Sequence, residues 1–234
     1  MGSINSLEQL LDALQHNTFG HIAIKAEDFL RQSAQDGDPK VKQLLLDILD
    51  QPVQSSEDAK SVRSALVWLG GYHHTDLVPV FLKLLVGKEE KRPGAIIAII
   101  GLIVAGVIQP GDPTVTQTLL TALAQKENNH EMIIRALGEM KATQTIDILV
   151  PYLAPENNIY LRTAAVSALF SLGREAGRKD ILEKIIALVD DPDLDVHNSA
   201  ISCLHTFHRE LFKEDFNMLD FIRHWRPGYP WRKG

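Results

Sequence analysis

Apolar residues recur along this chain at spacings of three and four residues, and no stretch alternates strictly between apolar and polar residues. The first spacing places apolar side chains on one face of an α-helix, whereas strict alternation would indicate a half-buried strand. The pattern therefore predicts an all-α protein, with short connections between helices at 7–14, 22–34, 40–49, 58–69, 77–86, 95–107, 115–124, 131–140, 146–153, 161–172, 181–189, 196–207 and 216–225.

Residue types that begin and end helices support these boundaries. Asp38-Pro39 and Asp112-Pro113 place a capping carboxylate before a proline, which needs no hydrogen bond from its nitrogen in the first turn of a helix. Gly70-Gly71 and Gly173 occur where a helix end favours a left-handed residue. We expect these glycines to terminate their helices.

The most apolar segment is GAIIAIIGLIVAGVI, residues 94–108. It is shorter than the roughly 18 to 20 residues that a membrane-spanning helix needs. A charged run precedes it and a turn rich in proline and glycine follows it. We therefore expect a helix that is buried on all sides.

The chain also contains an internal repeat. Residues 151–165 align without a gap with residues 186–200, an offset of 35 residues, which pairs Leu153 with Leu188 and Ala165 with Ala200. A second similarity links residues 77–82 with residues 149–153. Periods of this size are typical of stacked units that each need a neighbour to bury their apolar face.

In residues 158–169 and 193–200, an acidic or amide turn is followed by an aliphatic residue and an alanine-rich helix, and residues 158–169 also carry an arginine. This order resembles the HEAT-repeat pattern. The resemblance implies a right-handed α-α superhelix, a HEAT-like solenoid of about five to six helix pairs. It implies one domain over 1–234, with capping helices in 1–37, repeats in 38–207 and a C-terminal cap and tail in 208–234. The HEAT-like subunits of phycobilin lyases share this pattern.

Composition limits the function classes. The 45% apolar content allows a large core, and a net charge of −6 argues against nucleic acid or an anionic membrane as a partner. Residues 1–14 have no secretory-signal pattern, and the single cysteine, Cys203, can form no internal disulfide. We expect a cytoplasmic protein.

Two groups of residues suggest metal chemistry, and both lack ligands. His130-Glu131 resembles the His-Glu pairs of HEAT-type deoxyhypusine hydroxylases, but those enzymes use several pairs and this chain has one. His197, Cys203, His205 and His208 do not have the spacing for one zinc ion, since His197 and His208 are about 16 Å apart along a helix. We predict no catalytic residue, no metal and no cofactor.

Basic residues early or midway in the helices are candidates for partner binding. In a HEAT-like stack, one helix of each pair lines the concave face, and the candidates on those helices are Arg63, Arg135, Arg162 and His197. They would form a row that meets an acidic partner. Alternatively, such an arginine binds an acidic cap in the neighbouring turn, such as Asp193 or Asp195.

The C-terminal segment 223–234 combines basic and aromatic residues with proline and glycine. Trp225, Tyr229 and Trp231 either dock into a partner or fold back to cover the end of the stack.

The absence of catalytic residues favours a non-catalytic protein–protein interaction module, an adaptor, assembly factor or inhibitor that binds another protein on its concave face. The alternative is a phycobilin-lyase-like subunit or chaperone, which would need an apolar groove with a cation for tetrapyrrole propionates. The sequence leaves the identity of the partner and the oligomeric state open.

Overall fold

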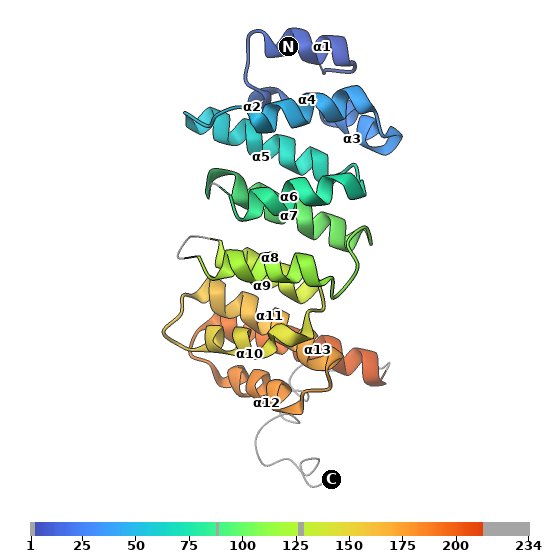
Figure 1. Ribbon diagram of the computed structural model, residues 1–234. Helices are drawn as coiled ribbons and strands as arrows, with labels where there is room; N and C mark the ends of the chain where they lie inside the picture. The colour runs from blue at the N-terminus through green and yellow to red at the C-terminus, as the bar shows by residue number, and fades with distance from the viewer. Residues whose placement is uncertain (1–2, 88, 126–128, 213–234) are drawn as a thin grey trace. The chain divides into compact units, whose positions relative to one another are not determined.

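The computed structural model describes residues 3–87, 89–125 and 129–212, and over these residues the protein is all-helical (Figure 1). Thirteen α-helices and five 3₁₀ turns are present there, and no strand. The all-α prediction is confirmed. The chain divides into two compact units, Met1–Ala136 and Leu137–Gly234, which are described separately below. The prediction of one continuous domain stays a prediction.

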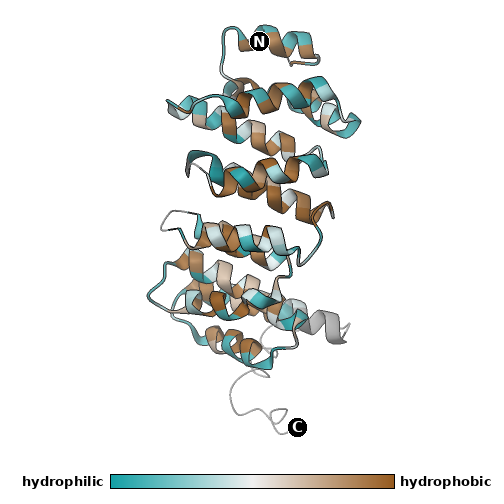
Figure 2. Cartoon of the chain, viewed as in Figure 1, coloured by the Kyte–Doolittle hydropathy of each residue, from teal (hydrophilic) through white to brown (hydrophobic). Residues whose placement is uncertain are grey.

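The first unit contains eight helices and the greater part of a ninth. They are α1 (Leu7–Leu14), α2 (Phe19–Ile22), α3 (Glu27–Asp36), α4 (Pro39–Asp50), α5 (Ser56–Gly70), α6 (Val78–Leu85), α7 (Arg92–Val104), α8 (Pro113–Leu123) and α9 (His130–Glu139), with 3₁₀ turns η1 (Thr75–Leu77) and η2 (Glu89–Lys91). Helices α2, α5 and α7 pack side by side in one layer, while α4 covers α5 and α6 covers α7. Apolar residues line the surfaces between the helices (Figure 2).

Glycines set the close packing of α5 on α7. A Cβ atom added to Gly70 would lie 3.2 Å from the Cα atom of Ala98, and one added to Gly94 would lie 2.6 Å from Cδ1 of Leu66. Residues 66 and 70 thus face residues 94 and 98, so the two helices are parallel. Such contacts leave no room for a larger side chain, which explains why glycine occupies both helical positions despite its low helix propensity.

The second unit contains α10 (Ile146–Leu149), α11 (Ile159–Glu175), α12 (Lys179–Ala187) and α13 (Leu194–Phe212), with turns η3 (Thr143–Thr145), η4 (Val150–Leu153) and η5 (Leu188–Asp190). Helix α11 packs against α12 and α13. Helices α11 and α13 begin 35 residues apart, at 159 and 194, as the internal repeat predicts. The paired residues Ala165 and Ala200 are both fully buried.

The two Asp-Pro helix starts are confirmed. The Asp38 carboxylate accepts hydrogen bonds from the amides of Lys40 and Val41, and Asp112 does the same for Thr114 and Val115 at 2.9 and 3.0 Å. Each carboxylate satisfies two amides that have no partner within the helix.

The prediction for the helix-ending glycines was right for the end of α5, which falls at Gly70-Gly71, and wrong for the left-handed conformation and for Gly173. Gly71 follows α5 with a φ of −70°, and Gly173 lies inside α11, where an added Cβ atom would be 2.9 Å from Ile181. Gly173 is therefore a position of close packing, and Gly71 has an ordinary right-handed backbone conformation. The left-handed glycine after α11 is Gly177, with a φ of 64°.

Two predicted helices are interrupted. The predicted helix 22–34 is split, because α2 ends at Ile22 and the chain passes through tight turns, with Lys25 bonded to the carbonyl of Ile22, before α3 begins. The predicted helix 146–153 changes from α10 to the 3₁₀ turn η4, which contains Pro151. Proline has no amide hydrogen to continue an α-helix.

Helix α7 is not buried on all sides, contrary to the prediction for residues 94–108. Ile97 is 40% exposed and Val104 is 73% exposed, while Ile96 and Ile99 are fully buried. The helix is apolar around most of its circumference (Figure 2), yet only part of that circumference faces other helices. Its apolar character therefore exceeds what the core requires.

Candidate interaction surface

Arg162 is held inside the second unit. It is 6% exposed, and its guanidinium forms a two-point ion pair with Asp191, including a 3.2 Å bond from Nη1 to Oδ1. Its Nε donates to the carbonyl of Leu153, at the end of η4. The acidic partner is Asp191 instead of the Asp193 or Asp195 suggested by the sequence. The contacts support the structural alternative for this residue.

His197 is the counterpart of Arg162 in the repeat, because the two positions are 35 residues apart and each is the fourth residue of its helix. Its Nδ1 donates to the carbonyl of Val189 in η5. Burial raises the pKa of Asp191, but hydrogen bonds from Arg162 and the Asp193 amide, and the charges of Arg162 and His197, lower it by more. The net result is a pKa below the ordinary value for aspartate.

The same arrangement recurs at two other helix starts. Arg92, the first residue of α7, is 1% exposed and donates to the carbonyls of Leu85 and Gly87 at the end of α6. His130, at the start of α9, bonds through Nε2 to the carbonyl of Gln125 at 2.7 Å. Cations and ring N–H groups at these positions satisfy carbonyls at the end of the preceding helix. Basic residues early in these helices thus connect neighbouring helices.

Arg63 and Arg135 lie differently. Both are exposed, Arg63 on the eighth position of α5 and Arg135 on the sixth position of α9. Arg63 has no ion pair or hydrogen bond with any residue in the described part of the chain. Of the four predicted basic candidates, Arg63 and Arg135 face solvent, whereas Arg162 is buried and His197 is half-buried.

The three aromatic candidates of the tail, Trp225, Tyr229 and Trp231, lie outside the described residues, and so does the predicted helix 216–225. Their predicted role as a cap or a docking motif stays a prediction. His208 also lies where side chains are not described, whereas His205 is half-buried on α13.

Four exposed apolar residues lie on the layer formed by α2, α5 and α7. Ile24, just after α2, is 81% exposed, and Val67 on α5 is 44% exposed. Ile97 and Val104 follow on α7. Residue 70 faces residue 98, so Val67 lies level with residue 95. Ile97 is two residues further along α7, about 3 Å along the helix axis. We call Ile24, Val67, Ile97 and Val104 the apolar face.

A hollow of about 230 Å³ lies within this face. Its lining consists of Ala23, Ile24, Glu27, Arg63, Ser64, Val67 and Trp68. Trp68 is half-buried, so part of its ring remains accessible in the hollow. The hollow thus combines an apolar lining with the guanidinium of Arg63 at its edge. Sequence reasoning identified Arg63 and missed Ile24, because it placed Ile24 inside a continuous helix.

Carboxylates around the hollow are already engaged. Glu27 pairs with Arg31 on the next turn of α3, and Glu57 pairs with Lys60 at 2.8 Å and His21 at 2.6 Å. The hydrogen bond from Lys60 lowers the pKa of Glu57, although burial opposes this effect. Arg63 is therefore the cation at this site that no described carboxylate neutralises.

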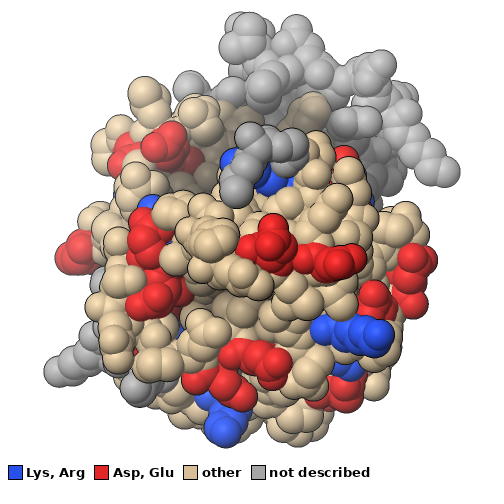
Figure 3. Space-filling model, turned by 90° about the horizontal axis from the view of Figure 1, so that it is seen from above, with Lys and Arg blue, Asp and Glu red and all other residues tan. Residues whose placement is uncertain are grey.

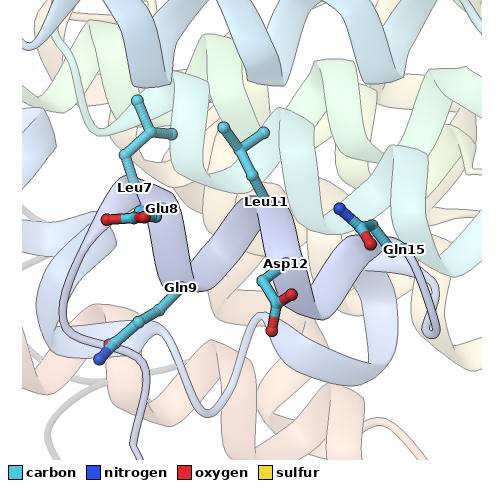
Figure 4. A pocket seen from close by; sticks show the side chains of 6 residues that line it. All are labelled: Leu7, Glu8, Gln9, Leu11, Asp12 and Gln15. Carbon is cyan, nitrogen blue, oxygen red and sulfur yellow. The ribbon is translucent and has the colours of Figure 1, made fainter.

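A second, wider hollow of about 780 Å³ lies against α1 alone (Figure 4). Leu7 and Leu11 point to one side of the helix, and Gln9 and Asp12 point to the other. Acidic side chains are scattered over the surface that is seen from above (Figure 3). One helix cannot enclose a ligand, so this hollow is a poor candidate for a small-molecule site.

The described residues contain no group of three histidine, cysteine or acidic side chains that could hold a metal ion. Within the same ranges, no helix has the length and apolarity needed to cross a membrane. Cys203 is half-buried, and burial raises the pKa of its thiol to about 11. A thiol with this pKa is a weak nucleophile at neutral pH.

Comparison of the sequence with models of protein families found no match. A search of curated proteins found no significant relative either.

Proposed function

We propose that this chain is a non-catalytic protein-interaction module, built as a HEAT-like solenoid of about five to six helix pairs, that binds a partner protein through the apolar face. The observation that carries the proposal is the exposure of Ile24, Val67, Ile97 and Val104 on the layer that contains α2, α5 and α7. Single exposed apolar residues are ordinary, but several on adjoining helices are typical of an interaction surface.

The residue types fit this proposal. Trp68 and Arg63 line the hollow within the face, and tryptophan and arginine are enriched among residues that dominate protein–protein binding energies. A HEAT-like arrangement would place this layer on the inner side of the stack, where an extended partner can contact successive helices. The buried Arg162 and the half-buried His197 are then structural residues of the repeat.

A tetrapyrrole is less well supported as the occupant. The hollow has an apolar lining and a cation, as that alternative requires, but its volume of about 230 Å³ is below the roughly 300–1,000 Å³ of small-molecule sites. Co-expression with a bilin tests this alternative, and the proposal expects purified protein without a visible absorption band.

The proposal is tested by affinity purification from cells with tagged wild-type protein and with the variants Val67→Glu and Ile97→Glu. Ile148→Glu is the matched control, because Ile148 is 47% exposed on α10, which belongs to the second unit. Quantitative mass spectrometry should show a stoichiometric partner with wild type and the control, and at least a tenfold loss with either face variant. Circular dichroism must show that all variants remain folded. Equal retention by all four proteins contradicts the proposal.

A further inference from the structure

We infer that the hollow at α5 binds a partner segment in which an acidic side chain lies one helical turn or less from a bulky apolar side chain. This inference rests on the proposed function and specifies the chemistry of the partner. The acidic group would bind Arg63, and the apolar side chain would enter the space between Ile24, Val67 and Trp68.

Charge is the first argument. Arg63 is exposed and has no partner among the described residues, while Glu27, the carboxylate that shares the hollow, already pairs with Arg31. Glu57, nearly two turns before the hollow on α5, pairs with Lys60 and His21. A basic partner would meet no unengaged carboxylate at these positions. An acidic partner would meet a guanidinium, which forms strong two-point hydrogen bonds with carboxylates.

Shape is the second argument. A volume of about 230 Å³ accommodates one or two side chains, whereas a small-molecule ligand of the size of a tetrapyrrole needs more space. The lining residues come from the turn after α2, from the start of α3 and from two successive turns of α5. Arg63 and Val67 are four residues apart on one face of α5, about 6 Å along the axis. The same spacing separates residues i and i+4 of a partner helix, so an acidic residue and an apolar residue at that spacing match both groups.

Helix α7 extends the surface for the remaining turns of such a segment. Its exposed side carries Ile97 and Val104, and at Gly101 between them an added Cβ atom would meet nothing within 4 Å. A partner helix whose acidic residue binds Arg63 on α5 would then continue over the uncharged surface of α7. The expected partner is therefore an amphipathic helix with its acidic residue near one end.

The test selects peptides without assuming a sequence. A phage library of random dodecapeptides is selected on full-length wild type and, separately, on Arg63→Glu. Wild type should enrich sequences with Asp or Glu three or four residues from Leu, Ile, Phe or Trp. Arg63→Glu should enrich Lys or Arg at the acidic position. Enriched sequences without this exchange, or no enrichment at all, overturn the inference.

The best peptide is then titrated against full-length protein carrying Trp225→Phe and Trp231→Phe, which leaves Trp68 as the single tryptophan. Binding should change the emission of Trp68, and Arg63→Gln should weaken it about tenfold, with a smaller effect at high salt. Arg135→Gln is the control, since Arg135 is exposed on another helix. Unchanged emission or equal effects of both substitutions overturn the inference.

Two further measurements separate the inference from the proposed function. If Ile97→Glu loses the cellular partner and Arg63→Glu keeps it, the apolar face binds and the acidic chemistry is wrong. If light scattering shows a dimer of wild type that Arg63→Glu converts to monomer, the occupant is a second copy of this chain, and the inference of a separate partner is overturned.

Discussion

The ion pair between Arg162 and Asp191 gives the sharpest stability prediction, because it separates a structural arginine from a binding arginine. Both side chains are 7% exposed. Replacing Arg162 with methionine keeps most of the packing volume but leaves the Asp191 carboxylate buried without its counterion. Breaking a buried pair in this way costs about 3–5 kcal/mol. Asp191 still accepts a hydrogen bond from the Asp193 amide, so we expect the lower end, about 3 kcal/mol.

The assay is thermal and urea unfolding followed by circular dichroism. The pair lies within the second unit, and for a unit of its size about 3 kcal/mol lowers the midpoint by about 12–24 °C. Arg178→Met is the matched control, because Arg178 forms exposed pairs with Asp180 and Asp147 and its loss should lower the midpoint far less. The double variant Arg162→Met with Asp191→Leu should recover most of the loss.

The pH dependence gives an independent check. The pKa of Asp191 is lower in the folded protein, so its contribution is fully present above the pKa of the unfolded chain. That contribution disappears as the pH falls through the folded pKa, and the difference in stability between wild type and Arg162→Met should narrow in acid. If Arg162→Met and Arg178→Met have equal effects, or if Arg162→Met weakens partner binding at full stability, the structural assignment of Arg162 is refuted.

Other predictions concern packing, capping and reactivity. Gly138→Ala should destabilise by roughly 1–3 kcal/mol in urea unfolding, because the new Cβ atom would lie 3.0 Å from Cα of Ala168, whereas Gly101→Ala should stabilise by up to about 1 kcal/mol. Asp112→Ala should cost about 1 kcal/mol in the same assay, since two amides at the start of α8 lose their acceptor. Cys203, with a raised pKa, should react with iodoacetamide on the order of tenfold more slowly in native than in urea-unfolded protein, as mass spectrometry of the alkylated chain would measure.

The helices could be predicted from the sequence because their signals are local. Asp38 and Asp112 act on amides two and three residues away, and the apolar spacing reflects burial on one helix face. Gly173 was misread because a buried packing glycine and a helix-ending glycine have the same sequence signal. Only the position of Ile181 beside it distinguishes the two.

The candidate surface was only partly predictable. Arg63 and Arg162 looked equivalent in sequence, since each lies in the first half of a helix that follows a turn. Their burial differs because Asp191 is present beside Arg162, 29 residues away along the chain, and no such group lies beside Arg63. Ile24 was missed because the residues around it carry no sequence signal for the turns that expose it. The exposure of a side chain depends on residues that are distant in the sequence, and a single sequence does not show which of them lie beside it.

The bonds at the helix starts also bear on how the protein folds. Arg92 contacts a carbonyl seven residues earlier, His130 one five residues earlier, and His197 one eight residues earlier. Each bond closes a helical hairpin at a small loop-closure entropy, so a hairpin can form before its neighbours are in place. Chains with such local contacts fold rapidly and can emerge from the ribosome hairpin by hairpin, each exposing an apolar side only until the next one packs on it.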